Sequence, residues 1–157
     1  MLRREFFKKL GFVAAAAAVV PSMGFASSTS VATQGTGPFT FEQALKAITG
    51  SKGAKESSLI SLKVPEIAEN GAVVPVTIEV ESPMTANNYV KTIHVFATKN
   101  SNSRCAAVHL TPANGKAMFA TRVKLGTTQD IATIVEMSDG SFLMAKQNVK
   151  VTIGGCG

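Results

Sequence analysis

The chain has 157 residues, of which 16 are Lys or Arg, 10 are Asp or Glu and two are Cys. This length allows one modest domain and excludes a multidomain enzyme. Hydrophobic residues make up 45% and charged residues 17%, which excludes a wholly disordered chain and a polytopic membrane protein. Two cysteines are too few for a disulfide-stapled miniprotein, and the sequence lacks the Cys and His spacing of a zinc or iron site. We expect neither a metal nor a cofactor.

The net charge of +6 is unevenly distributed along the chain. Four of the 16 basic residues and one of the 10 acidic residues lie within residues 1–26, which leaves a net charge of +3 on the rest. These remaining basic residues are scattered, and no aromatic side chains that could stack on bases are interleaved with them. The sequence therefore predicts no nucleic-acid partner.

Residues 1–26 have the parts of an export signal. Arg3-Arg4-Glu5-Phe6-Phe7-Lys8 precedes the apolar run 10–20, and Gly24-Phe25-Ala26 provides a cleavage site of mainly small residues. Because a membrane-spanning helix needs about 20 apolar residues, a cleavable signal is favoured over a permanent anchor. The paired arginines are typical of the twin-arginine route, with an ordinary Sec signal or an uncleaved anchor as alternatives. We expect a periplasmic protein that is not held in the membrane after signal removal.

The next two segments are a leader and a helix. Residues 27–38 are rich in Ser, Thr and Gly without periodicity, which predicts a flexible leader. Thr40 can cap the following helix, Gln43 can complete a capping box and Gly50 can end it. The apolar face of this helix is formed by three residues at helical spacing: Phe41, Leu45 and Ile48.

From residue 58 onward the hydrophobic pattern has a period of two. The clearest strand is 74–80, where Val74, Val76, Ile78 and Val80 share one face. Further strands are expected at 58–64, 89–98, 105–110, 119–125, 131–137, 142–149 and 149–153, with turns at Asn70-Gly71 and Asp139-Gly140. Residues 39–153 are therefore expected to form an all-β, immunoglobulin-like antiparallel β-sandwich with one N-terminal amphipathic helix.

The sequence ends in Gly154-Gly155-Cys156-Gly157, which we expect to be a flexible carrier arm. Glycine makes such a segment thin and mobile, and an extended tether from Val151 would reach about 16 Å. Cys156 can therefore be presented to a cleft in another protein. The sequence provides no cation or base to activate this thiol, so a receiving protein must supply it.

Cys105 lies within a predicted strand, on a face that it would share with Ala107 and His109. The main interpretation is a small buried hydrophobic residue. Two alternatives stay open, namely a disulfide with Cys156 and an exposed second redox thiol.

Several short motifs precede the terminal segment 149–157 along the chain: Pro65-Glu66-Ile67-Ala68-Glu69-Asn70-Gly71, Val74-Pro75-Val76, Glu81-Ser82-Pro83-Met84 and Thr121-Arg122-Val123. With these motifs in this order, the chain resembles the SoxY family, the sulfur-carrier subunit of the periplasmic Sox thiosulfate-oxidation system. The resemblance implies an immunoglobulin-like carrier that is not itself an enzyme. The family's usual ending is Gly-Gly-Cys-Gly-Gly, and this sequence has one glycine fewer.

The resemblance also implies partners and a role for Cys156. In this family the carrier forms a heterodimer with SoxZ, and the arm cysteine carries the sulfur intermediates. The haem protein SoxXA attaches thiosulfate oxidatively, the hydrolase SoxB releases sulfate, and a sulfane dehydrogenase, where there is one, oxidises the remaining sulfur.

Two other classes of function remain alternatives. A thiol-dependent redox enzyme would use Cys156 with His94 or His109 as its base, although both histidines lie in predicted strands and suit a structural role. An exported binding module would use the sandwich alone, and its function would not depend on residues 154–157.

Overall fold

The structure is a computed structural model that describes residues 39–155. The predicted signal, the predicted leader, Cys156 and Gly157 lie outside the described residues. The elements occur in this order: α1 (Phe41–Thr49), β1 (Lys55–Glu56), β2 (Ile60–Lys63), β3 (Ile67–Asn70), β4 (Val74–Val80), β5 (Val90–Ala97), β6 (Arg104–His109), the 3-10 turn η2 (Pro112–Asn114), β7 (Ala117–Val123), β8 (Gln129–Met137) and β9 (Phe142–Ile153).

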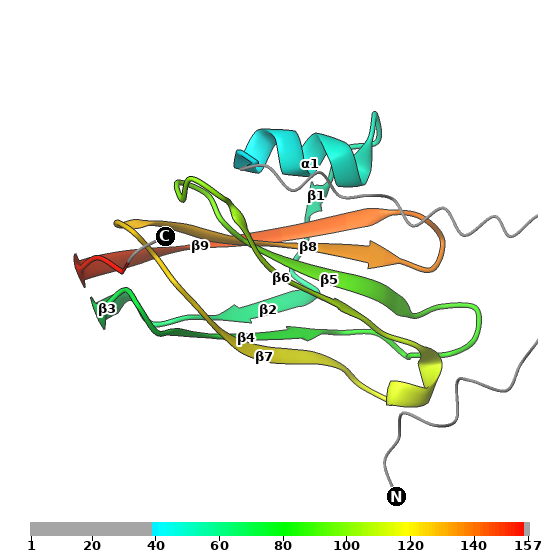
Figure 1. Ribbon diagram of the computed structural model, residues 1–157. Coiled ribbons are helices and arrows are strands. Elements are labelled where there is room, and N and C mark those ends of the chain that lie inside the picture. The colour runs from blue at the N-terminus through cyan, green and yellow to red at the C-terminus, as the bar shows by residue number, and fades with distance from the viewer. Residues whose placement is uncertain (1–38, 156–157) are drawn as a thin grey trace, which may run out of the picture. The chain divides into compact units, whose positions relative to one another are not determined.

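The strands form two sheets that face each other, with α1 on the outer side of the larger one (Figure 1). The larger sheet has the order β1-β9-β8-β5-β6, and β3 also pairs with β9. The smaller sheet has the order β2-β4-β7. This arrangement confirms the predicted all-β sandwich with one helix.

The helix begins and ends at the predicted residues. Thr40 Oγ1 accepts a hydrogen bond from Gln43 N at 3.3 Å, and Gln43 Oε1 accepts one from Thr40 N at 3.1 Å, which completes the capping box. Gly50 follows the last turn with a φ of 59°. The apolar face of α1 packs on the outer side of the larger sheet, where the rings of Phe41 and Phe96 meet edge to face at 5.7 Å.

The main core lies between the two sheets. The four apolar side chains of β4 at positions 74, 76, 78 and 80 are all buried, as the alternation predicted. They share one hydrophobic cluster with residues of the larger sheet: Ile93, Val95, Ile131 and Val135. Burying one Val or Ile side chain of this kind contributes about 1.5–3 kcal/mol.

Three features of the sheets differ from the sequence-based expectation. The last two predicted strands are one strand of 12 residues, β9, because pairing with β8 up to Val149 continues directly into pairing with β3 from Lys150. Strand β3 was missed, since Ile67–Asn70 is too short to show a period. Both β1 and β3 pair with β9 in parallel, so the sandwich is not purely antiparallel.

A bulge in the β5–β6 ladder corrects the expected face of Cys105. The register shifts between Val95 and Phe96, so that Val95 is opposite Ala106 and Phe96 is opposite Arg104. Two successive residues of β6 then point to the same side. Cys105 packs against the main core together with Ala106, and it does not share a face with His109.

Candidate functional site

The candidate site is the end of β9, where the predicted carrier arm begins. The backbone N–H of Gly71 donates to Ile153 O at 2.7 Å, and that of Gly155 donates to Leu125 O at 2.9 Å. Leu125 N in turn donates to Gly71 O at 2.7 Å. Three distant parts of the chain, the 71–72 turn, the 125–126 loop and the end of β9, are thus joined by main-chain hydrogen bonds.

These segments approach each other so closely that the glycines leave no space for a side chain. A Cβ at Gly155 would lie 2.6 Å from Ala72 Cα, and one at Gly154 would overlap Gly126 O. A Cβ at Gly71 would overlap Leu125 O and lie 2.9 Å from Gly155 N. None of these three glycines has a positive φ, so close approach, and not an unusual backbone conformation, accounts for glycine here.

We call Gly154 and Gly155 the arm root, and Gly71, Ala72, Leu125 and Gly126 the arm dock. Strand β9 ends at Ile153, where the last strand was expected to end, so a tether cannot be free from Val151 onward. Beyond the strand, Gly155 is hydrogen-bonded to Leu125. Sequence reasoning missed the dock. Its only signal was Asn70-Gly71, which indicated a turn.

A polar network behind the dock holds the 125–126 loop in place. Asn100 Nδ2 donates to Lys124 O at 2.8 Å, and Asn100 Oδ1 accepts from Gly126 N at 3.1 Å. The fully buried Gln129 donates through Nε2 to the same Asn100 oxygen at 2.8 Å and to Thr127 O at 3.1 Å. The buried member of this network, Gln129, has its polar groups paired, which favours one position of the loop.

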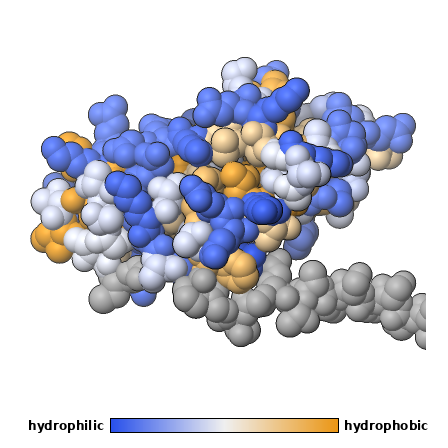
Figure 2. Space-filling model, turned by 90° about the horizontal axis from the view of Figure 1, so that it is seen from above, coloured by the Kyte–Doolittle hydropathy of each residue, from blue (hydrophilic) through white to orange (hydrophobic). Residues whose placement is uncertain are grey.

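Exposed hydrophobic side chains lie around the arm root. Ile67, Val73 and Ile153 are 60%, 56% and 68% exposed, respectively. Ile67 is in β3, which pairs with the last residues of β9, and Val73 follows the dock. In Figure 2, hydrophobic surface is visible at the left, the end at which Figure 1 places β3 and the end of β9.

Cys105 has the environment of an unreactive thiol. Its sulfur donates weakly to Ser103 O at 3.6 Å, and burial raises its pKa to about 11. It is a free thiol, without a disulfide to any of residues 39–155. A cavity of about 320 Å³ reaches this residue and is also lined by Arg104, Arg122 and Lys124. The interpretation as a half-buried hydrophobic residue fits best, because a thiol with this pKa stays protonated at neutral pH.

The two histidines are not brought to the arm root. His94 is half-buried in the middle of β5, and burial, the largest effect, lowers its pKa. The charge of Glu136 opposes this shift, and His109 and Arg104 lower the pKa slightly further. His109 is opposite Thr92, and its Nδ1 lies 3.1 Å from Thr92 Oγ1. The end of β5 nearer to the dock leads into the 98–103 turn. Thr92 lies six residues before this turn, so Thr92 and the His109 opposite it are about 20 Å along the strand from that end.

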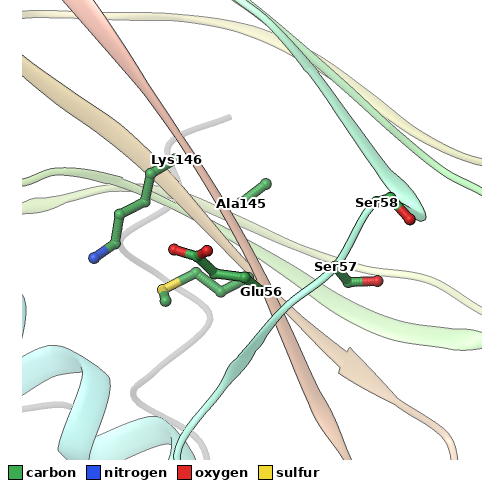
Figure 3. Close-up of a pocket in the computed structure, with 6 residues that line it drawn as sticks. Glu56, Ser57, Ser58, Ala145 and Lys146 are labelled. Carbon is green, nitrogen blue, oxygen red and sulfur yellow. The ribbon is translucent and has the colours of Figure 1, made fainter.

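A second open cavity, of about 370 Å³, lies beside β9 (Figure 3). Its lining includes Glu56, Ser57, Ser58 and Lys146, and the Lys146 ammonium also lies 5.2 Å from the ring centre of Phe41. Neither a cysteine nor a histidine lines it. Within residues 39–155 there is no group of three or more His, Cys, Asp or Glu that could hold a metal ion. In the same range, no helix is long and apolar enough to cross a membrane.

These features define a class of protein: an immunoglobulin-like β-sandwich whose last strand leads through two tightly packed glycines to a cysteine. The chain belongs to the SoxY family, because the family model described as "Sulfur oxidation protein SoxY" matches residues 45–156. The resemblance noted in the sequence is thereby confirmed. Membership in this family indicates a sulfur-carrier protein of the Sox system and not an enzyme.

Solved structures agree with this assignment. The sulfur carrier protein SoxY from Chlorobium limicola f thiosulfatophilum is 33% identical, covers 71% of this chain and 96% of its own, and superposes with a TM-score of 0.60. The superoxide reductase (neelaredoxin) from Ignicoccus hospitalis shares only the fold: it is 16% identical, with 73% and 94% of the two chains covered and a TM-score of 0.50. The comparison with curated proteins found no match.

Proposed function

We propose that this chain carries thiosulfate-derived sulfur covalently on the Cys156 thiol and presents it to partner enzymes in the periplasm. The observation that supports this most is the family match, which extends to residue 156 and therefore includes the cysteine. The described part of the arm ends at Gly155, one residue before that thiol. The periplasmic location is proposed from the predicted signal in residues 1–26.

The proposed chemistry needs only a thiol from this chain. The Cys156 thiolate and the outer sulfur of thiosulfate form an S–S bond, and the two electrons released pass to a haem partner similar to SoxXA. Water then cleaves the bond between the terminal sulfone and its neighbouring sulfur, which releases sulfate and leaves a persulfide on Cys156. A hydrolase similar to SoxB is the proposed catalyst, and a SoxZ-like subunit is the proposed dimer partner.

Covalent attachment keeps the sulfur intermediate from diffusing away between successive enzymes. A tethered sulfur species stays at an effective concentration on the order of millimolar near each enzyme that is docked on the carrier. A sulfane dehydrogenase, where there is one, would act on the same persulfide. The exposed Ile67, Val73 and Ile153 beside the arm root give such enzymes an apolar surface to contact.

Intact-mass spectrometry tests this proposal with a matched pair of cysteine variants. The full chain is incubated with thiosulfate and its haem partner, and a mass increase of one thiosulfate is expected. Cys156→Ser should abolish the increase. Cys105→Ser should leave it unchanged, because burial keeps the Cys105 thiol protonated. Adduct formation that persists in Cys156→Ser, or that is lost in Cys105→Ser, would contradict the proposal.

A further inference from the structure

We propose that the arm dock positions the carrier arm and sets its reach, by holding the arm root against the sandwich until a partner draws it out. This inference rests on the proposed role of Cys156. Gly71, Ala72, Leu125 and Gly126 are then positioning residues, which act on sulfur transfer only through the arm.

The first argument is that a hydrogen bond from Gly155 N to Leu125 O joins the arm root to the dock, and that the dock residue which accepts it is itself fixed. Leu125 contributes both its backbone groups, because its N–H donates to Gly71 O and its C=O accepts from Gly155 N. Asn100 fixes the adjoining loop through Lys124 O and Gly126 N. Leu125, which accepts the hydrogen bond from Gly155 N–H, is thus fixed by its own bond to Gly71 and by the bonds of Asn100 to the residues before and after it. This favours one position of the arm root.

The second argument is the complementary shape of the contact. At Gly50, Gly53 and Gly115 an added Cβ would meet no other atom within 4 Å. Gly154 and Gly155 instead touch main-chain atoms of Gly126 and Ala72, which cannot move aside as the end of a flexible side chain can. At these positions glycine allows the arm root to lie flat in the dock.

The consequence is an arm with two lengths. While the root is docked, the tether consists of the single step from Gly155 to the adjacent Cys156, which corresponds to about 3.5 Å of chain. Once the root leaves the dock, the tether begins at Ile153 and spans three residues, or about 10 Å. A partner with a shallow site can take the thiol from the docked arm, whereas a partner with a deep site must first open the dock.

Amide hydrogen exchange on the full-length chain tests the dock directly. In the wild type, the Gly155 N–H is expected to exchange at least tenfold more slowly than in an unstructured chain. Gly154→Ala places a methyl group against Gly126 O and should remove that protection, while the amides of Ile93 and Val95 keep theirs. Thr152→Ala is the matched control, because it shortens an exposed side chain in β9, two residues before Gly154, and adds nothing to the dock.

A kinetic measurement separates positioning from a general effect on folding. If docking opposes delivery, Gly154→Ala should lower the KM of a deep-site partner enzyme for the carrier about two- to tenfold and leave kcat unchanged. Gly71→Ala, which crowds the dock from the opposite side, should act in the same direction. If Gly71→Ala does not fold, the wild-type exchange rate and Gly154→Ala still decide the question.

The proposed role of the dock would be contradicted if the Gly155 amide of the wild type exchanged without protection. It would also be contradicted if Thr152→Ala lost as much protection at Gly155 as Gly154→Ala does. These outcomes are distinct from failure of the proposed function. An adduct on Cys156 with an unprotected Gly155 amide rejects the dock alone. A protected amide without any adduct rejects the carrier role of Cys156.

Discussion

The two ends of β9 are anchored in opposite ways. At its start, β9 pairs in parallel with β1, and Phe142 and Met144 pack into the apolar cluster beneath α1. At its end, β9 pairs in parallel with β3, and the chain continues into bare main chain that lies against main chain. Side-chain packing holds the start of β9, and main-chain contacts that only glycine allows hold the chain that follows its end. The difference shows that a segment of small residues can be held by main-chain contacts without a hydrophobic cluster.

Glycine has a different role at each end. Gly140, in the turn that leads into β9, has a φ of 78°, and a Cβ there would meet only the end of the Lys52 side chain, at 3.3 Å. Gly154 has no positive φ, but a Cβ there would meet backbone. The first position requires glycine for its conformation and the second requires it for space.

The largest expected effect is in the apolar cluster that anchors the start of β9. Phe96→Ala removes from this cluster the buried β5 ring that contacts Phe41, and it should lower the free energy of unfolding by about 3–5 kcal/mol. Ile153→Ala is the control at the other end, where a side chain that is 68% exposed should cost less than about 0.5 kcal/mol. Urea unfolding of both variants measures the difference. Similar losses would mean that side-chain packing anchors both ends.

A medium effect distinguishes the two roles of glycine. Gly140→Ala should cost about 1–2 kcal/mol, because a left-handed conformation is unfavourable for alanine. Gly140→Asn should recover much of this loss, since asparagine tolerates that conformation. Gly154→Asn should be no better than Gly154→Ala, because the clash at Gly154 comes from any Cβ. Thermal unfolding of the four variants is the measurement, and recovery by asparagine at both positions would refute the distinction.

The smallest expected effect is a pH dependence that arises in β5, where His94 stacks beside Phe96, a member of the cluster that anchors the start of β9, with ring centres 6.2 Å apart. Burial lowers the pKa of His94 below its ordinary value of 6.5, so the unfolded chain takes up a proton at a higher pH than the folded one. The stabilisation is therefore present above pH 6.5 and is lost as the pH falls below it.

The test compares the wild type with His94→Gln between about pH 7.5 and pH 5.5, a range that spans the ordinary pKa of histidine. The wild type should lose more of its thermal stability on acidification than the variant does. The opposite charge of Glu136 partly offsets the effect of burial, which keeps the difference small. An identical pH dependence of the two proteins would show that His94 does not contribute.

Local patterns in the sequence were sufficient for the regular elements. The capping box of α1 depends on Thr40 and Gln43, three residues apart, and the alternation of β4 depends on neighbours two residues apart. Both were therefore predictable. The SoxY family was also recognisable from its motifs, because these are short stretches whose order is preserved.

The features that sequence reasoning missed depend on contacts between distant residues. The bulge at Val95 and Phe96 turns Cys105 toward the core, and no property of Cys105 itself signals that change. The dock joins Gly71 to Gly155, and its hydrogen bonds were not visible in either segment alone. The sequence does not distinguish a glycine that makes the backbone flexible from one that allows close packing, so the arm root was predicted to be flexible.

The position of β9 within the larger sheet affects how the protein is made. This strand is the last element along the chain, yet it lies between β8 on one side and β1 and β3 on the other. Residues 55–56 and 67–70 must therefore wait for residues 142–153 to emerge from the ribosome before they gain a pairing partner. The sandwich can close only when its final strand has been synthesised, so a chain interrupted before β9 would leave these edges open to aggregation.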